Sequence, residues 1–510
     1  MECRAPASGK VIGVVARTAP SDVADVVARA RRAQESWRNV PLAERAKRVL
    51  RFRDAIAEND ELLVETISRE CGKPRHEALV HEVWSTLDLA TYYCKHATRI
   101  LADEAIDLHL FRHRQSYVRY EARGVVGIVA PWNFPFWIPM ADVFAALVTG
   151  NAVVVKPSEV TPLSMQKALD VYRATGLPDD LFAVIQGGPE VGEALVASDI
   201  QKLVFTGSVA VGKKVAAACG AKLLPCVLEL GGKAPLVARA DADVDTVARA
   251  IVFGAFANSG QACISVERVY VHETIHDDVV AKVVELVRGL KQGDPSIDYV
   301  DLGAITFPRQ VTVARDLVLE ALDKGAVLAA GGIPEHDDAR FVPPTVLTHV
   351  DHGMRVMKEE IFGPVVAIMK VRDDDEAVAL ANDSHLGLNA YVYSGDREAG
   401  RRLAERIEAG SVVVNDVLVN HAAVEAPFFG IKQSGLGRTH GDAALRDMAE
   451  ARHVNVERSL ASTLARALPL AAPDAFGFPY SAGKLGVLRR AMELLYRPSK
   501  RSGRGLLRLG

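Results

Sequence analysis

The sequence lacks the features that mark several protein classes. It has no run of about 18 consecutive apolar residues, so we expect no membrane-spanning helix. Its formal net charge is only −3, whereas nucleic-acid binders usually carry a basic excess, so we expect no nucleic-acid partner. The first residues, MECRAPASGKVIG, lack the apolar segment of a secretory signal. We therefore expect a cytoplasmic protein.

Cysteine is scarce, with six in 510 residues and none in a CxxC pair. This pattern favours buried thiols in a reducing compartment over a disulfide framework or a zinc site, and we expect no bound metal. We also find no internal repeat and no low-complexity linker. A chain of this length accommodates roughly two to four domains.

Short apolar, β-branched runs dominate residues 124–231: GVVGIVAP, AVVVKPS, LFAVIQGG, KLVFTGS and LLPCVLELGG. Helical segments separate several of them, and this alternation predicts a parallel α/β sheet. Ligands of such sheets gather at the carboxyl ends of the strands. A second α/β stretch follows at about 232–430. Alternating residues at 104–121 predict a two-stranded excursion.

The segment FTGSVAVGKK (205–214) comes close to a phosphate-binding P-loop. Lys214 replaces the Ser or Thr that would hold Mg²⁺, which argues against an NTPase. What remains predicts a strand that turns through Ser208, as N-cap, into a helix that Gly220 ends. Such a helix start suits a diphosphate, although any α/β protein has similar turns.

Several loops hold residues with both a chemical and a structural interpretation. Glu229 in CVLELGGKAP is either a structural carboxylate whose hydrogen bonds are satisfied, or a general base whose pKa is raised by an apolar setting. Cys263 in NSGQACISVERVYV is core filler or a thiolate nucleophile. Asn133, between two prolines in PWNFP, could donate to an oxyanion. KPSE places Lys156 and Glu159 at another strand end.

The C-terminus is basic. Residues 481–510 contain eight Lys or Arg and a single acid, Glu493. GKLGVLRRAMELLYR could form an amphipathic helix that lies on an anionic membrane surface. The alternative is a helix packed on the protein or a solvated end.

Taken in order, PWNFP, KPSE, GGPEVG, FTGS, ELGGK, GQAC, EEIFGPV and KQSGLGR resemble the motifs of the aldehyde dehydrogenase superfamily, over about residues 5–455. Glu229 and Cys263 stand at the family's usual spacing. The finer pattern looks most like bacterial semialdehyde or broad-range members. The resemblance implies an α/β fold with a Rossmann-like NAD(P)-binding domain (1–103 and 122–231) and a catalytic domain (232–445). It also implies oligomerisation strands (104–121 and 446–458), and a C-terminal extension (459–510) follows.

The resemblance also implies the reaction, the oxidation of an aldehyde to a carboxylic acid with NAD(P)⁺ and water. Cys263 would attack the aldehyde carbon, while the Asn133 amide and the Cys263 N–H hold the oxyanion. Hydride transfer would leave a thioester, and Glu229 would activate the water that hydrolyses it. Glu229, a helix dipole and the positive nicotinamide ring all remain candidates for activating the thiol.

The cofactor residues are likewise implied by the resemblance. Lys156 and Glu159 would meet the adenine ribose, Ser208 the pyrophosphate and Glu360 the nicotinamide ribose. Glu159 would accept ribose hydroxyls and repel a 2′-phosphate, so we expect NAD as the preferred cofactor, and NADP use would require Glu159 to turn away. The other implied cofactor residues are Trp132, Ser158, Gly188, Gly192, Phe205, Gly207, Leu230 and Phe362.

Departures from the family pattern concern the substrate side. Phe429 in PFFG stands where the family usually has glycine, and the loop 415–427 differs from the common form, with Phe428 as a candidate wall residue for the aldehyde. The presence of Glu229 argues against a CoA-acylating enzyme. A non-catalytic homologue and a membrane-docked fatty-aldehyde dehydrogenase are the alternatives. We expect a homodimer or homotetramer, because an unpaired strand edge is a liability in a monomer.

Overall fold

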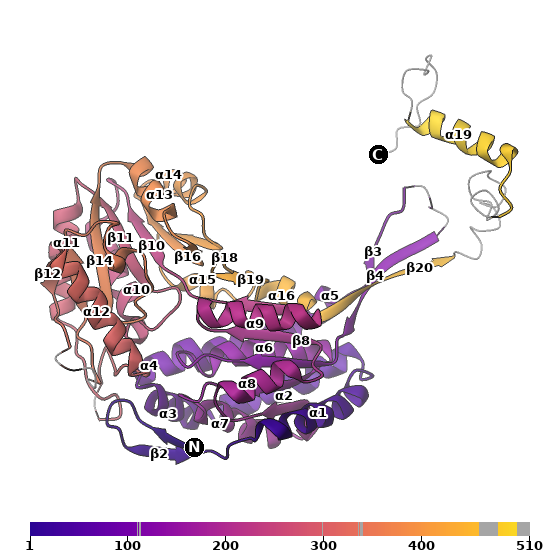
Figure 1. The fold of residues 1–510 in the computed structure, drawn as a ribbon, viewed down its shortest axis with the longest axis horizontal. Coiled ribbons are helices and arrows are strands. Elements are labelled where there is room, and N and C mark those ends of the chain that lie inside the picture. Colours follow the sequence, from indigo (N-terminus) through magenta and orange to yellow (C-terminus); the bar gives the residue numbers. More distant parts are fainter. Residues whose placement is uncertain are drawn as a thin grey trace. The chain divides into compact units, whose positions relative to one another are not determined.

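The structure, a computed structural model, describes residues 1–109, 111, 114–297, 299–334, 336, 340–457 and 478–496. The chain divides into two compact units (Figure 1). The first is made of residues 1–100 and 122–449, and the second of residues 101–121 and the chain from 450 onward. The predicted α/β class is confirmed, because the first unit contains largely parallel sheets and many helices.

The parallel sheet predicted within residues 124–231 is present. Its strand order is β19-β9-β8-β5-β6-β7, with parallel pairs from β9 to β7 and an antiparallel pair between β19 and β9. The apolar runs form buried strands here, as is typical of parallel sheets covered on both faces. The strands are β5 (Val125–Val129), β6 (Ala152–Lys156), β7 (Phe182–Val184), β8 (Lys202–Thr206), β9 (Cys226–Glu229) and β19 (Gly435–Leu436).

Helices connect and accompany these strands. The connecting helices are α6 (Trp137–Thr149), α7 (Leu163–Arg173), α8 (Pro189–Ala197) and α9 (Val209–Lys222). Before the sheet come η1 (Pro20–Asp22), α1 (Val23–Trp37), α2 (Leu42–Glu58), α3 (Asp60–Cys71), α4 (Arg75–Glu77), the π-helix η2 (Ala78–Trp84) and α5 (Ser85–Ile100).

The prediction that Gly220 ends the helix after Ser208 is wrong. α9 continues to Lys222, and Leu223 then turns left-handed with φ 54°. A glycine in a helix costs only about 1 kcal/mol relative to alanine, so it does not force an end. The predicted N-cap is confirmed, since the Ser208 side chain accepts a hydrogen bond from the Val211 N–H.

A second sheet has the order β12-β13-β14-β11-β10-β16-β17, antiparallel only at β12–β13. Two apolar clusters flank it. Its strands are β10 (Ala234–Ala238), β11 (Val266–His272), β12 (Val327–Ala330), β13 (Thr345–Thr348), β14 (Val365–Val371), β16 (Asn389–Tyr393) and β17 (Ser411–Val414). Its helices are α10 (Val244–Phe256), α11 (His276–Arg288), α12 (Arg309–Asp323), α13 (Asp374–Asn382) and α14 (Arg397–Ala404).

Short elements complete the first unit: β1 (Glu2–Arg4) with β2 (Val11–Val14), β15 (Leu386–Gly387) with β18 (Ile431–Lys432), η3 (Asp179–Leu181), η5 (Arg355–Met357), α15 (Val419–Ala422) and α16 (Gly441–Asp447). The domain boundary predicted at 231/232 falls between β9 and β10, which belong to different sheets. The domain boundaries stay predictions.

The second unit contains a sheet of order β20-β4-β3. Its strands are β3 (Glu104–Ala105), β4 (Arg114–Ala122) and β20 (Ala449–Glu457). The extended segments expected at 104–121 and 453–457 are therefore paired with each other. The helix expected in the basic tail is α19 (Ala482–Tyr496), while residues 458–477 and 497–510 lie outside the described residues. None of the described helices is long and apolar enough to cross a membrane.

Candidate active site

Parallel strands bring the predicted site residues to one edge of the first sheet. Val129 at the end of β5 pairs with Lys156 of β6 and with Phe205 of β8, and Thr206 pairs with Glu229 of β9. Their carboxyl ends therefore form one row, which is where open α/β sheets bind ligands.

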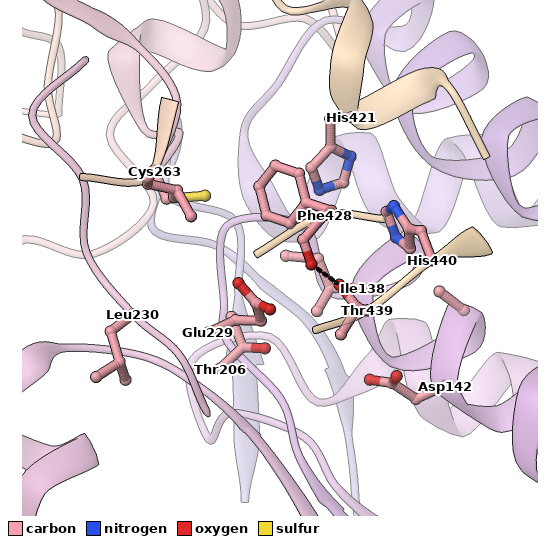
Figure 2. A pocket seen from close by; sticks show the side chains of 12 residues that line it. Ile138, Asp142, Thr206, Glu229, Leu230, Cys263, His421, Phe428, Thr439 and His440 are labelled. Carbon is pink, nitrogen blue, oxygen red and sulfur yellow. Dashed lines mark hydrogen bonds between the residues drawn. The ribbon is translucent and has the colours of Figure 1, made fainter. Parts of the chain in front are cut away.

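Glu229 and Cys263 face one small cavity of about 30 Å³ (Figure 2). Glu229 ends β9, and Cys263 lies in the loop between η4 (Ala257–Gly260) and β11. A Cβ on Gly232 would lie 2.1 Å from the Cys263 carbonyl oxygen, so only glycine lets the two segments approach this closely. The cavity has room for about one water molecule. Its lining is Ile138, Ala141, Asp142, Thr206, Glu229, Leu230, Cys263, Leu388, His421, Phe428, Thr439 and His440.

The Glu229 carboxyl is buried, and neither of its oxygens has a hydrogen-bond partner among the described residues. Burial first, and then the nearby charge of Asp142, raise the pKa of Glu229 well above its usual value. Burial also raises the pKa of Asp142 to about 7. An unpaired buried carboxyl is costly, and its proton affinity is shifted toward the range that suits a general base.

The Cys263 thiol is protonated at neutral pH in the protein alone. Burial, followed by the charges of Glu360 and Glu229, raises its pKa to about 12. A thiolate is the reactive form, so a proton acceptor or a positive charge has to act on this thiol before it can attack.

The loop before Cys263 has an unusual backbone. Asn258 and Ser259 have positive φ angles of 52° and 54°, which are costly for residues other than glycine. Asn258 is held in place because its N–H donates to Glu77 Oε1 (2.9 Å) and its side-chain amide donates to the Asn133 carbonyl oxygen (3.1 Å). The geometry of the loop is thus fixed by buried hydrogen bonds.

Asn133 lies against the same loop. Its Nδ2 donates to the carbonyl oxygen of Gln261 (2.9 Å), two residues before Cys263. Its own carbonyl oxygen accepts from Lys73 Nζ (2.7 Å), and Lys73 forms a fully buried ion pair with Glu82 (2.6 Å). Glu82 also accepts the two backbone N–H groups of residues 136 and 137, at the start of α6. Lys73 and Glu82 therefore position the Asn133 loop.

The chain matches the model of the aldehyde dehydrogenase family over residues 1–454. It is 38% identical to a 4,4'-diapolycopene aldehyde oxidase of Methylomonas sp, over 86% of this chain and 82% of that protein. It is 37% identical to a putative NADP⁺ succinate-semialdehyde dehydrogenase of Mycolicibacterium smegmatis, over 89% and 88%. Among solved structures, the NAD⁺ complex of a Bacillus cereus aldehyde dehydrogenase has a TM-score of 0.86 at 34% identity, covering 90% of this chain and 93% of that one.

The chain belongs to the aldehyde dehydrogenase family. The family resemblance inferred from the motifs is confirmed, and so is the reaction class, oxidation of an aldehyde with a nicotinamide cofactor. When bound, a nicotinamide cofactor would supply the hydride acceptor for this oxidation.

The strand-end row of this aldehyde dehydrogenase fits that cofactor. Lys156 is buried and its Nζ contacts Glu159 (2.9 Å), whose side chain is 45% exposed. Ser208 caps α9, whose first N–H groups suit a pyrophosphate. Glu360 accepts the Gly232 N–H (3.0 Å), and burial raises its pKa to about 8.

The remaining predicted cofactor residues lie in the same unit. Trp132 packs edge-on against Phe362, with ring centroids 5.3 Å apart. Phe205 and Leu230 belong to one apolar cluster, which Val209 and Val215 of α9 also join. Ser158 is buried in the loop after β6. A Cβ on Gly207 would lie 2.7 Å from the Phe205 ring, whereas Gly188 N-caps α8 and Gly192, within it, faces open space.

The predicted wall residue Phe428 does line the cavity, and its ring lies 4.9 Å from that of His421. Phe429 instead packs against Arg438, whose guanidinium carbon lies 5.3 Å from its ring centre. Sequence reasoning missed Asp142 and His440 and named only the loop that contains His421, because no motif distinguishes these three residues.

Proposed function

We propose that Cys263 is the nucleophile and Glu229 the general base of an NAD(P)-dependent aldehyde dehydrogenase. The observation that carries this assignment is that both side chains line one water-sized cavity. The thiol would add to the aldehyde carbonyl, and loss of hydride to the cofactor would leave a thioester on Cys263. Glu229 would then take a proton from the water that hydrolyses the thioester to the free acid.

Asn133 and the Cys263 N–H are the proposed oxyanion donors. One N–H of the Asn133 amide is used by Gln261, and an amide group has a second one to donate. Loss of one such donor typically lowers the rate about 10²–10³-fold. An NADH-formation screen over aliphatic, aromatic and semialdehyde substrates, with NAD⁺ and NADP⁺, tests the reaction. No NADH or NADPH from any aldehyde would contradict the proposal.

NAD is the proposed preferred cofactor, because the Glu159 carboxylate would repel a 2′-phosphate. Glu159→Gln is expected to raise kcat/KM for NADP⁺ relative to NAD⁺ by about ten-fold, since it removes one negative charge and leaves Lys156 free to pair with the phosphate. Steady-state kinetics with each cofactor measure this ratio. Glu193→Gln, the same charge change at an exposed position of α8, is the control. An unchanged ratio in Glu159→Gln would contradict the proposed role.

Self-association through the β20-β4-β3 sheet is the proposed route to a homodimer or homotetramer. β3 has only two residues, so much of the adjoining edge of β4 has no partner strand in the described residues. Such edges favour pairing with another copy of the chain. Residues 104–121 and 446–458 remain the proposed oligomerisation strands.

A cytoplasmic enzyme with peripheral membrane contact through its basic tail is a second proposal. α19 carries Lys484, Arg489 and Arg490 against Glu493, and apolar side chains such as Leu494 (76% exposed) are open to solvent. A basic helix with exposed apolar residues suits an anionic surface. The full chain is expected to float with anionic liposomes, whereas a chain without residues 481–510 is expected to stay in the unbound fraction. Equal flotation of both chains would reject the contact.

A further inference from the structure

A second and larger cavity also borders Cys263. It has a volume of about 210 Å³, and Val80, Phe134, Trp137, Phe253 and Leu418 are among its apolar walls. An apolar cavity of about 150 Å³ holds benzene, so on that scale this cavity holds about eight carbon atoms. Its remaining lining is His81, Ser85, Ala257, Asn258, Ala262, Cys263, Ile264, Val417, Val419, His421 and Ala422.

No Lys, Arg, Asp or Glu lines this cavity within the part of the chain that the structure describes. Burial lowers the pKa values of His81 and His421 to about 4, so both imidazoles are neutral at physiological pH. The nearby ammonium of Lys73 lies over the Phe134 ring and is already bound to Glu82. A carboxylate at the far end of a short semialdehyde would therefore be buried without a partner, which is costly.

The apolar surface continues beyond this cavity. A third cavity of about 470 Å³ shares four wall residues with it, namely Val80, His81, Phe253 and Ala257. The rings of His81 and Phe253 are 6.2 Å apart at this shared wall, and Phe253 is 48% exposed. Further apolar side chains line the third cavity: Val252, Phe256, Leu286, Leu290, Val300 and Leu302.

Of these two apolar cavities, only the outer one has Asp, Glu or Arg in the lining that the described residues provide. Glu77, Arg249 and Asp301 are part of its lining, and Arg249 is exposed to solvent. Glu77 is buried, so a carboxylate in the outer cavity would lie near another carboxyl group. The polarity of the route thus increases with distance from Cys263, as expected for a site that holds a long apolar chain with its far end near water.

We infer that this enzyme takes long, uncharged hydrocarbon aldehydes, whose chain runs from Cys263 through the 210 Å³ cavity and across the Val80–Phe253 wall into the 470 Å³ cavity. The inference rests on the proposed role of Cys263. Each apolar methylene that leaves water raises the binding affinity roughly four-fold. A substrate chain that reaches the third cavity therefore binds more tightly than a shorter one.

The ratio of kcat/KM for dodecanal to that for butanal tests the inference, with succinate semialdehyde as the charged comparison. The native enzyme is expected to prefer dodecanal to butanal by at least about 100-fold, and succinate semialdehyde is expected to be the poorest substrate. A preference for succinate semialdehyde, or equal use of butanal and dodecanal, would overturn the inference. Absence of turnover with every aldehyde would instead overturn the proposed function.

Two variants at the shared wall locate the route. Val80→Trp fills the wall and is expected to lower the dodecanal-to-butanal ratio at least about ten-fold, whereas Phe253→Ala opens it and is expected to raise the ratio. Leu319→Trp, at an exposed position of α12 outside both cavities, is the matched control. Melting temperatures show whether each variant folds. If Val80→Trp does not fold, the dodecanal-to-butanal ratio of Phe253→Ala alone tests the route. An unchanged ratio in Phe253→Ala would overturn the route.

Discussion

Cys263→Ala is expected to abolish NADH formation, with a loss of kcat of at least about 10⁴-fold, while cofactor binding persists. Removing the nucleophile of a covalent mechanism costs this much or more, because no step can follow. No other thiol lines either cavity at Cys263 in the described part of the chain. Absorbance at the NADH band measures turnover, and protein fluorescence quenching by NADH measures binding.

Cys226→Ala provides the control for this result. Cys226 is a half-buried free thiol at the start of β9, the strand that ends at Glu229, but it lines neither cavity. Its substitution is expected to leave kcat within about two-fold, in the range of ordinary substitutions away from a site. Residual turnover in Cys263→Ala above the level of a mock preparation would remove Cys263 from its proposed role.

The part of the site that could be predicted from sequence is the part encoded locally. Lys156, Ser208 and Glu229 each follow a short apolar run, and parallel pairing brings such strand ends to one edge. The N-cap at Ser208 depends on contacts within one helical turn. Pattern alone predicted where these residues lie, at strand ends and at a helix start, whereas the chemical roles of Lys156, Glu229 and Cys263 came from the family resemblance.

The site residues that were not predicted make their contacts with residues far away in the sequence. Lys73 lies in the short connection between α3 and α4, and Glu82 lies in η2. Charges in such segments are usually solvated, yet these two are buried together and Lys73 donates to the Asn133 carbonyl oxygen. Asp142 is one acid in an otherwise apolar helix, and only the fold places it in the cavity of Glu229. Nothing local distinguishes such residues from surface charges, so their burial can be known only from the structure.

Glu229→Gln is expected to separate the two halves of the reaction. Glutamine keeps the size of the side chain but cannot take a proton, so acylation and the first hydride transfer proceed while thioester hydrolysis stalls. We expect a burst of about one NADH per active site, followed by a steady rate about 10²–10⁴-fold below the native rate. Rapid-mixing absorbance measures both phases, and intact mass shows the acyl-enzyme. Equal slowing of burst and steady state would exclude Glu229 as the hydrolytic base.

The pH dependence of hydrolysis gives this assignment a second test. Burial and Asp142 raise the pKa of Glu229, so its ionised, base form increases as the pH rises through that pKa, and the steady rate rises with it. Asp142→Asn removes a neighbouring negative charge, which makes ionisation of Glu229 easier and moves the rising limb to lower pH. Glu229→Gln is expected to lose the limb. If the rising limb of the pH–rate profile persists in Glu229→Gln, or keeps its position in Asp142→Asn, another group controls hydrolysis.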